Sequence, residues 1–220
     1  IGAVKNGIKK EVANYVFTKI EPFADYGFNK SHAVSYALIA FQTAYLKTYY
    51  KEQFIAASMS TTLASTGKLR EYVEELKRLK VEVIRPSINN CFAEFKADNN
   101  KIYYGLGAIK SVGFEAISNI IKERENNGKF KSINDFINRT NPKDVNKLQL
   151  EGLVKAGVFD EVELNRKKLF NSIPKIIQTI KNKYDDKVSN QTNLFGNNLD
   201  SEVDSFEFDT ESKWSKKELL

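Results

Sequence analysis

The residues most able to do chemistry gather in one short stretch, GFNKSHAVSY at positions 27–36, which contains the only histidine of the 220-residue chain. Lys30, Ser31 and His32 stand where a helical pattern begins, and a helix N-terminus beside a cation is a common phosphate site. Tyr36 shares a helix face with His32 and offers a flat ring to a nucleobase. The same residues also fit a plain helix cap, with Ser31 as N-cap, His32 solvated and Tyr36 packed on its ring.

A second set of candidates lies in YYGLGAIKSVGFEAISNII, which resembles a helix-hairpin-helix DNA-binding motif. In such a motif, the turn between two helices presents backbone amides to a phosphate. Gly113 would let the backbone approach the anion, the following helix would add its positive dipole end, and Lys110 would add charge. Val112 is the apolar residue of the turn, and Ser111 stands where these motifs usually carry glycine.

The segment LQLEGLVKAGVFDEV repeats this pattern about 44 residues later, with Lys155, Ala156 and Gly157 in the turn. Two such hairpins in a basic region can grip both backbones of a DNA duplex. Binding of this kind depends little on base sequence and steeply on salt. The alternative is that Gly113 and Gly157 are ordinary helix C-caps.

The pentapeptide QTNLF, residues 191–195, places the apolar pair Leu194 and Phe195 in a polar, acidic segment that has no core to bury it. A pocket on a partner protein is the natural destination of such a pair. With Gln191, the pair resembles the Gln-x-x-Leu-Phe peptide by which bacterial replication proteins attach to the sliding clamp.

Charge is distributed unevenly along the chain, whose net charge is +6. Residues 185–212 hold eight acidic side chains and one basic one, a net charge of −7, and residues 213–220 carry +2, which leaves +11 for residues 1–184. A region this basic indicates a polyanionic partner such as nucleic acid.

Composition excludes several classes of site. One cysteine, Cys91, and one histidine rule out an internal disulfide and a zinc site made of the usual ligands. No apolar run could span a membrane and the N-terminus does not read as a signal peptide, so we expect no membrane partner and a cytoplasmic location. The only methionine is Met59, so we expect the chain to be a piece of a longer protein.

Hydrophobic periodicity predicts a mainly α fold. A short strand that ends before Pro86 and a β-hairpin around the turn 98–100 are expected between two helical regions. Residues 185–212 have the composition of a flexible linker. The expected helices lie within residues 1–25, 31–50, 51–63, 67–81, 114–125, 132–139, 143–155 and 164–183.

The run FADYGFNKSHAVSYALIAFQTAYLKTYY closely resembles the fingers region of the alpha subunit of bacterial DNA polymerase III. The resemblance continues in order through YYGLGAIKSVGFEAI, FKSINDFINR, LEGLVKAGVFD and QTNLFG, and KWSKKELL resembles the lead into a further domain. It implies helical fingers at 1–80, a small β element at 81–104, a tandem helix-hairpin-helix domain at 105–184, a linker with a clamp-binding peptide at 185–212 and the start of another domain at 213–220.

The resemblance also implies roles for single residues. Lys30 and His32 would contact the triphosphate of an incoming nucleotide beside Ser31, and Tyr36 would contact its base or sugar. The implied partners are primer–template DNA, deoxynucleoside triphosphates, the sliding clamp (beta subunit) and other replicase subunits. Duplex contacts would come from residues 110–113 and 155–157, and clamp attachment from Gln191, Leu194 and Phe195.

Nucleotidyl transfer needs two metal ions held by carboxylates, and the resemblance places these Mg²⁺ ions on a palm domain that precedes Ile1. We therefore expect no catalytic residue and no metal site in this chain. The nearest carboxylate pair, Glu207 and Asp209, lies in sequence typical of a linker and is not expected to bind metal.

The competing hypothesis is a non-enzymatic helix-hairpin-helix scaffold that binds DNA. A nucleotide-facing helix with Lys30, His32 and Tyr36 separates the two hypotheses, because a pure duplex binder has no use for it.

Overall fold

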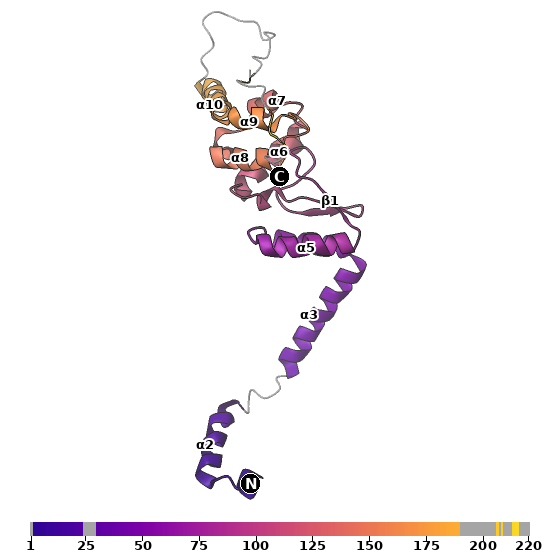
Figure 1. Ribbon diagram of the computed structural model, residues 1–220, viewed down its shortest axis with the longest axis vertical. Helices are drawn as coiled ribbons and strands as arrows, with labels where there is room; N and C mark the ends of the chain where they lie inside the picture. Colours follow the sequence, from indigo (N-terminus) through magenta and orange to yellow (C-terminus); the bar gives the residue numbers. More distant parts are fainter. Residues whose placement is uncertain (1, 24–29, 190–205, 207, 209–212, 216–220) are drawn as a thin grey trace, which may run out of the picture. The chain divides into compact units, whose positions relative to one another are not determined.

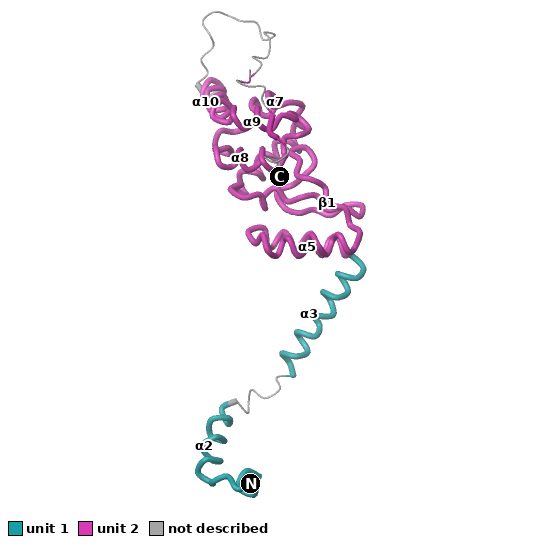
Figure 2. Tube along the Cα trace, in the orientation of Figure 1, with its two compact units in different colours: residues 1–50 teal, residues 51–220 magenta. Residues whose placement is uncertain are grey.

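The computed structural model divides the chain into two compact units, residues 1–50 and 51–220 (Figure 2). Helices dominate both units and a small three-stranded sheet lies in the second, which confirms the expected mainly α fold (Figure 1). The predicted domain boundaries stay predictions. The structure describes residues 2–23, 30–189, 206, 208 and 213–215.

The first unit consists of short helices followed by one long helix. The helix predicted within residues 1–25 is present at Lys10–Ile20, but it does not extend to the start of the chain, because Gly7 adopts a left-handed φ of +83° after a first short helix. The long helix agrees with the one predicted at 31–50. The elements are α1 (Gly2–Lys5), α2 (Lys10–Ile20), the 3₁₀ helix η1 (Glu21–Phe23) and α3 (Lys30–Tyr49).

Apolar side chains of this unit are exposed. Val34, Leu38 and Phe41 follow one another along α3, and the side chain of Phe41 is 68% exposed. None of the described residues of α1, α2 or α3 is buried. A helix with this many exposed apolar side chains normally packs against another surface, so α3 has the composition of a helix that a larger protein covers.

The second unit begins with two helices packed on a sheet, α4 (Lys51–Ser60) and α5 (Thr66–Arg78). The sheet order is β1-β3-β2, with β1 parallel and β2 antiparallel to β3. Asn99 and Asn100, with φ of +48° and +59°, form the two-residue turn and confirm the predicted β-hairpin. The strands are β1 (Glu82–Ile84), β2 (Lys96–Asp98) and β3 (Lys101–Tyr103).

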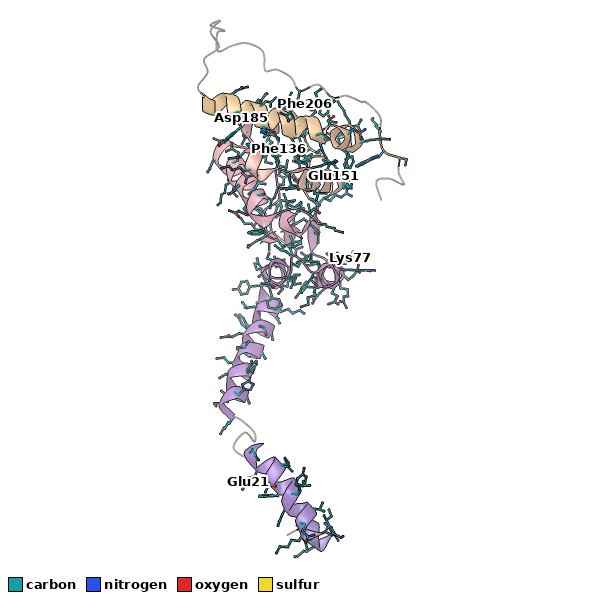
Figure 3. All side chains as sticks on the ribbon, turned by 90° about the vertical axis from the view of Figure 1, so that its left-hand side faces the viewer. Glu21, Lys77, Phe136, Glu151, Asp185 and Phe206 are labelled. Carbon is teal, nitrogen blue, oxygen red and sulfur yellow. The ribbon has the colours of Figure 1, made fainter. Side chains whose placement is uncertain are left out.

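The remaining helices enclose a core that is separate from the one between α4, α5 and the sheet. Phe136 lies in its interior (Figure 3). They are η2 (Leu106–Ala108), α6 (Phe114–Asn127), α7 (Ile133–Arg139), η3 (Pro142–Asp144), α8 (Lys147–Lys155), α9 (Arg166–Asn171) and α10 (Ile173–Ser189).

Two predicted helix boundaries in this region are wrong. The helix predicted at 143–155 begins only at Lys147, because the Asn146 side chain caps it by accepting a hydrogen bond from the Gln149 N–H. The single helix predicted at 164–183 is two helices that meet at Ser172. Pro174 accounts for the break, since it has no N–H to donate and is tolerated only in the first turn of a helix.

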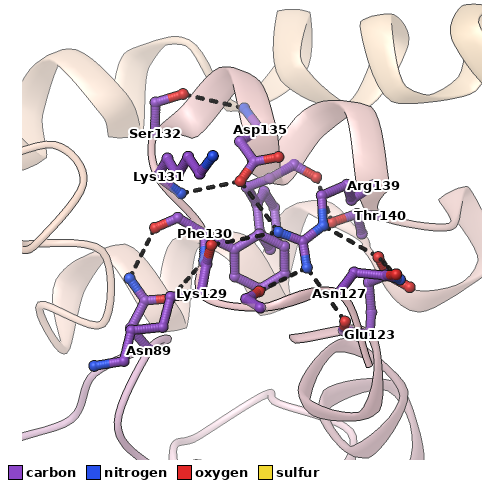
Figure 4. A network of polar contacts seen from close by, with 12 residues as sticks. Asn89, Glu123, Asn127, Lys129, Phe130, Lys131, Ser132, Asp135, Arg139 and Thr140 are labelled. Carbon is purple, nitrogen blue, oxygen red and sulfur yellow. Dashed lines mark hydrogen bonds and ion pairs between the residues drawn. The ribbon is translucent and has the colours of Figure 1, made fainter. Parts of the chain in front are cut away.

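Arg139 joins α6 to α7 (Figure 4). Its guanidinium donates to Glu123 Oε1 and Asp135 Oδ2, both at 3.1 Å, and to the Gly128 carbonyl at 2.8 Å. It also lies 4.4 Å from the centre of the Phe130 ring. These contacts hold α7 in place. Along the chain, α7 lies between the turn at Gly113 and the turn at Gly157.

The closest backbone approach in this region is at Gly152 in α8. A Cβ atom at this position would lie 2.7 Å from the Lys110 carbonyl oxygen. Glycine therefore lets α8 pack directly on the turn that precedes α6, and this packing brings the two predicted hairpins together.

We predict that Gly152→Ala lowers the free energy of unfolding by about 1–3 kcal/mol, because the added methyl group forces α8 away from Lys110. Gly67→Ala is the matched control, since Gly67 is also helical and a Cβ there meets nothing within 4 Å. Urea denaturation of both variants measures the difference. Equal stability of the two variants would contradict the packing described for Gly152.

Candidate nucleic-acid interface

The first turn runs from η2 into α6 and has the backbone of a helix-hairpin-helix turn. Ser111 adopts a left-handed φ of +69°. Val112, 8% exposed, turns inward and donates its N–H to the Ile109 carbonyl at 3.1 Å. Ser111 therefore takes the conformation that glycine usually supplies, at a cost of about 1–2 kcal/mol for a residue with a side chain.

Gly113 is the N-cap of α6, so the interpretation of this residue as a helix C-cap is wrong. Its φ of −72° and ψ of 128° suit any residue, and a Cβ atom would meet only the Ala116 Cβ at 3.9 Å. Neither conformation nor internal packing requires glycine here. What the missing side chain does leave is open access to the N–H groups of the first turn of α6.

The second turn ends α8 in a Schellman motif, as the C-cap interpretation of Gly157 predicted. Gly157 has a left-handed φ of +75° and donates to the Val154 carbonyl at 3.0 Å, while Val158 donates to the Leu153 carbonyl at 3.0 Å. Gly157 is buried, whereas Gly113 is exposed.

The expected repeat of helix, turn and helix is not symmetrical. After Gly157 the next helix, α9, begins only at Arg166. The Arg166 side chain covers the second turn, because its guanidinium fills the space that a Cβ on Gly157 would need and donates to the Lys155 carbonyl at 3.1 Å. Its hydrogen bonds to Asp160, the shorter of which is 2.6 Å, raise the pKa of the Arg166 guanidinium. The second turn therefore presents no helix N-terminus directly after it.

The cations of the two turns are both exposed. Lys110 contributes its carbonyl to the contact with Gly152, and Lys155 lies three residues further along α8. The Lys155 ammonium lies 5.0 Å from the centre of the Phe170 ring. Ala156, between Lys155 and Gly157, is the C-cap residue of α8 and is half-buried.

The nucleotide-binding candidates lie on the first two turns of α3, in the other unit. Lys30, Ser31 and His32 are exposed, as is Tyr36 at 61%. The ring centres of His32 and Tyr36 are 4.3 Å apart and the planes are tilted by 42°, so the two side chains share a face as predicted. Ser31 is the second residue of the helix, and the prediction that it is the N-cap is wrong.

Other candidates fall outside the part of the chain that the structure describes. They are Gln191, Leu194 and Phe195 of the clamp-binding peptide and the carboxylate pair Glu207 and Asp209. Among the described residues, no group of three or more His, Cys, Asp or Glu side chains is placed to hold a metal ion. No described helix combines the length and apolar character needed to cross a membrane.

Sequence reasoning missed three aromatic residues beyond α10. Phe206, Phe208 and Trp214 are half-buried and pack against the core of the second unit. Their signal was their type, because large aromatic side chains are unusual in an otherwise acidic, polar segment. Gly152 was missed as well, although a glycine inside a helical pattern indicates a close approach.

Comparison with known proteins finds one matching motif family and several similar proteins. Residues 80–169 match the helix-hairpin-helix motif family. The chain is 42% identical, over its whole length, to DNA polymerase III subunit alpha of Borreliella burgdorferi and covers 19% of that protein. It is 41% identical to the Campylobacter jejuni subunit over 89% of this chain and 16% of that protein, and 43% identical to the Thermus aquaticus subunit over 72% and 13%.

Fold, turn geometry and motif match identify residues 80–169 as a helix-hairpin-helix region, and this motif is a DNA-binding motif. The chain belongs, as a segment, to the DNA polymerase III alpha subunit family. It spans about a fifth or less of the length of these curated relatives.

We predict that Ser111→Gly raises the free energy of unfolding by about 0.5–1 kcal/mol, because glycine adopts the left-handed conformation without a steric cost. Gly157→Ala should have the opposite effect, since its φ is equally left-handed and the Arg166 side chain fills the space. Thermal unfolding of both variants checks the signs. A loss of stability in Ser111→Gly would show that the turn does not have this backbone.

Proposed function

We propose that this chain is part of a replicative DNA polymerase and acts in template-directed DNA synthesis. The observation that carries the proposal is the 42% identity that covers the whole chain, α3 and both turns included. On this proposal, the protein is a cytoplasmic nucleotidyltransferase whose partners include primer–template DNA and other replicase subunits.

Catalysis is assigned to a part of the longer protein that this chain does not include. Polymerases hold two divalent metal ions, here Mg²⁺, between carboxylates that bring the primer hydroxyl and the triphosphate together. The described residues do not fit this requirement, because their carboxylates are not grouped for a metal ion. On this proposal, the role of this segment is to bind and position the substrates.

Duplex DNA is assigned to the two turns. The first turn leads into the 14-residue helix α6, whose first N–H groups have no acceptor within the helix, and the exposed Lys110 lies in the same turn. The second turn contributes the exposed cation of Lys155. Contacts of this type neutralise phosphates without reading bases.

The duplex assignment is tested with the 220-residue chain and labelled duplexes of unrelated sequence. Log affinity should fall with log salt by about 0.9 for each phosphate neutralised, equally for every sequence. Gly113→Ala should weaken binding about tenfold, the equivalent of one hydrogen bond to a charged group, while stability changes by less than about 1 kcal/mol. Gly67→Ala is the control and should bind as the unmodified chain does. Unchanged affinity in Gly113→Ala would remove the first turn from the interface.

The incoming nucleotide is assigned to the start of α3. Lys30 and His32 supply positive or protonatable groups near a helix N-terminus for the triphosphate, with Ser31 between them. The Tyr36 ring, next to that of His32, offers a face to the base or sugar.

In the longer polymerase, His32→Ala and Tyr36→Ala should raise the apparent KM for nucleotides or lower turnover, and leave duplex affinity unchanged. Thr43→Ala, further along the same helix, is the control for helix stability. Steady-state kinetics and a duplex-binding assay on the same preparations separate the two effects. Weaker duplex binding with normal nucleotide use would instead favour the non-enzymatic scaffold.

The sliding clamp is assigned to the peptide Gln191 to Phe195. A leucine–phenylalanine pair in a polar segment can fill a hydrophobic pocket on a partner protein. Leu194→Ala combined with Phe195→Ala should abolish binding to the clamp in a surface plasmon resonance assay and leave thermal stability unchanged. Full affinity in this double variant would refute the assignment.

A further inference from the structure

The three aromatic residues after α10 form a cluster that we name the aromatic latch: Phe206, Phe208 and Trp214. The Phe206 N–H donates to Asn134 Oδ1 of α7 at 2.9 Å. The rings of Phe206 and Phe208 meet edge to face, with centres 5.2 Å apart. Figure 3 shows Phe206 beside the helices of the second unit. The aromatic latch therefore packs against the same unit that carries the two turns.

Lysines of α9 and α10 lie over the latch rings. The Lys168 ammonium is 4.0 Å from the centre of the Phe208 ring, and the Lys175 ammonium is 5.4 Å from that of Phe206. Ammonium groups at these distances are attracted by the ring quadrupole. The latch and the basic helices therefore stabilise one another.

One further chain of contacts leads from the latch to the second turn. The Trp214 ring lies 5.4 Å from that of Phe170 in α9, measured between centres. The Lys155 ammonium lies 5.0 Å from the centre of the Phe170 ring, at the other end of this chain of contacts. Trp214, Phe170 and Lys155 therefore form a continuous stack that ends at an exposed cation of the proposed duplex interface.

The Lys155 side chain is better able to bind a phosphate than the nearby Lys168 and Arg166, because those two already pair with carboxylates. Lys168 already pairs with Glu163 at 3.6 Å, and Arg166 pairs with Asp160. Within the described part of the chain, Lys155 forms no ion pair with a carboxylate. Its ammonium has three N–H donors, and contact with the Phe170 ring leaves donors available for a phosphate oxygen.

We propose that Trp214 is a positioning residue for duplex binding, which acts through Phe170 to hold the Lys155 ammonium in place. A lysine side chain loses much rotational freedom when it binds a phosphate, so a lysine that is already ordered binds with less loss. This inference rests on the proposed duplex binding. It adds Trp214, which lies beyond the predicted linker, to the residues that support duplex binding.

A double-mutant cycle in the 220-residue chain tests the inference. Lys155→Ala should weaken binding of a non-specific duplex about three- to tenfold and reduce the salt slope by about 0.9, the loss of one phosphate contact. Trp214→Ala should produce part or all of the same loss. Because Trp214 acts through Lys155, the double variant should bind no more weakly than Lys155→Ala alone, and Trp214→Phe should restore affinity.

One further variant and one signal keep the test decisive. If Trp214→Ala unfolds, Phe170→Leu keeps an apolar side chain in place but removes the ring under Lys155, and should give the same loss. Trp214 is the only tryptophan, so its fluorescence reports on the latch alone and should change when duplex is added.

Three results would overturn the inference: normal binding by Trp214→Ala and Phe170→Leu while Lys155→Ala binds weakly, additive losses in the double variant, or fluorescence that duplex leaves unchanged. If the unmodified chain itself binds no duplex at low salt, the proposed duplex binding fails and this inference fails with it. If only Lys155→Ala weakens binding, the duplex proposal stands and the positioning role of Trp214 does not.

Discussion

The contact on which the DNA-binding region depends is the one between the backbone of Gly152 and the carbonyl of Lys110. It joins α8 to the turn before α6 at a distance that leaves no room for a side chain. Val112 on one side and Leu153 and Val154 on the other enter the same buried core. Because this core forms only when the two segments meet, the packing of α8 on the turn before α6 holds both segments in place.

The two turns differ in the groups that they could offer to a phosphate under the proposed function. At the first, Gly113 places no side chain beside the N–H groups that open α6, and Ser111 adopts a left-handed conformation that shapes the turn. At the second, Arg166 and its partner Asp160 cover Gly157, and the cation of Lys155 is what remains accessible. Backbone donors and a side-chain cation both bind phosphates, and neither reads a base.

How much of this could be read from the sequence depended on how local the signal was. The hairpin turn at Asn99 and Asn100 and the long helix α3 were predicted, because turn chemistry and periodicity act over a few residues. Both lysine-glycine turns were found for the same reason. The covering of Gly157 by Arg166, the packing at Gly152 and the stack from Trp214 to Lys155 join residues distant in sequence. A local pattern can mark Gly152 as a site of close approach, but it does not identify the partner residue, so these contacts required the structure.

The central claim is that the first turn binds the phosphate backbone of DNA through the exposed amides that open α6. The most direct measurement is an NMR titration of the isotope-labelled chain with a short duplex, which follows each backbone amide separately. The account predicts the largest shift changes at residues 112–116, with a second group near Lys155, and reversal of both by added salt. Amides of residues 112–116 that do not shift at saturating duplex, while others do, would contradict it.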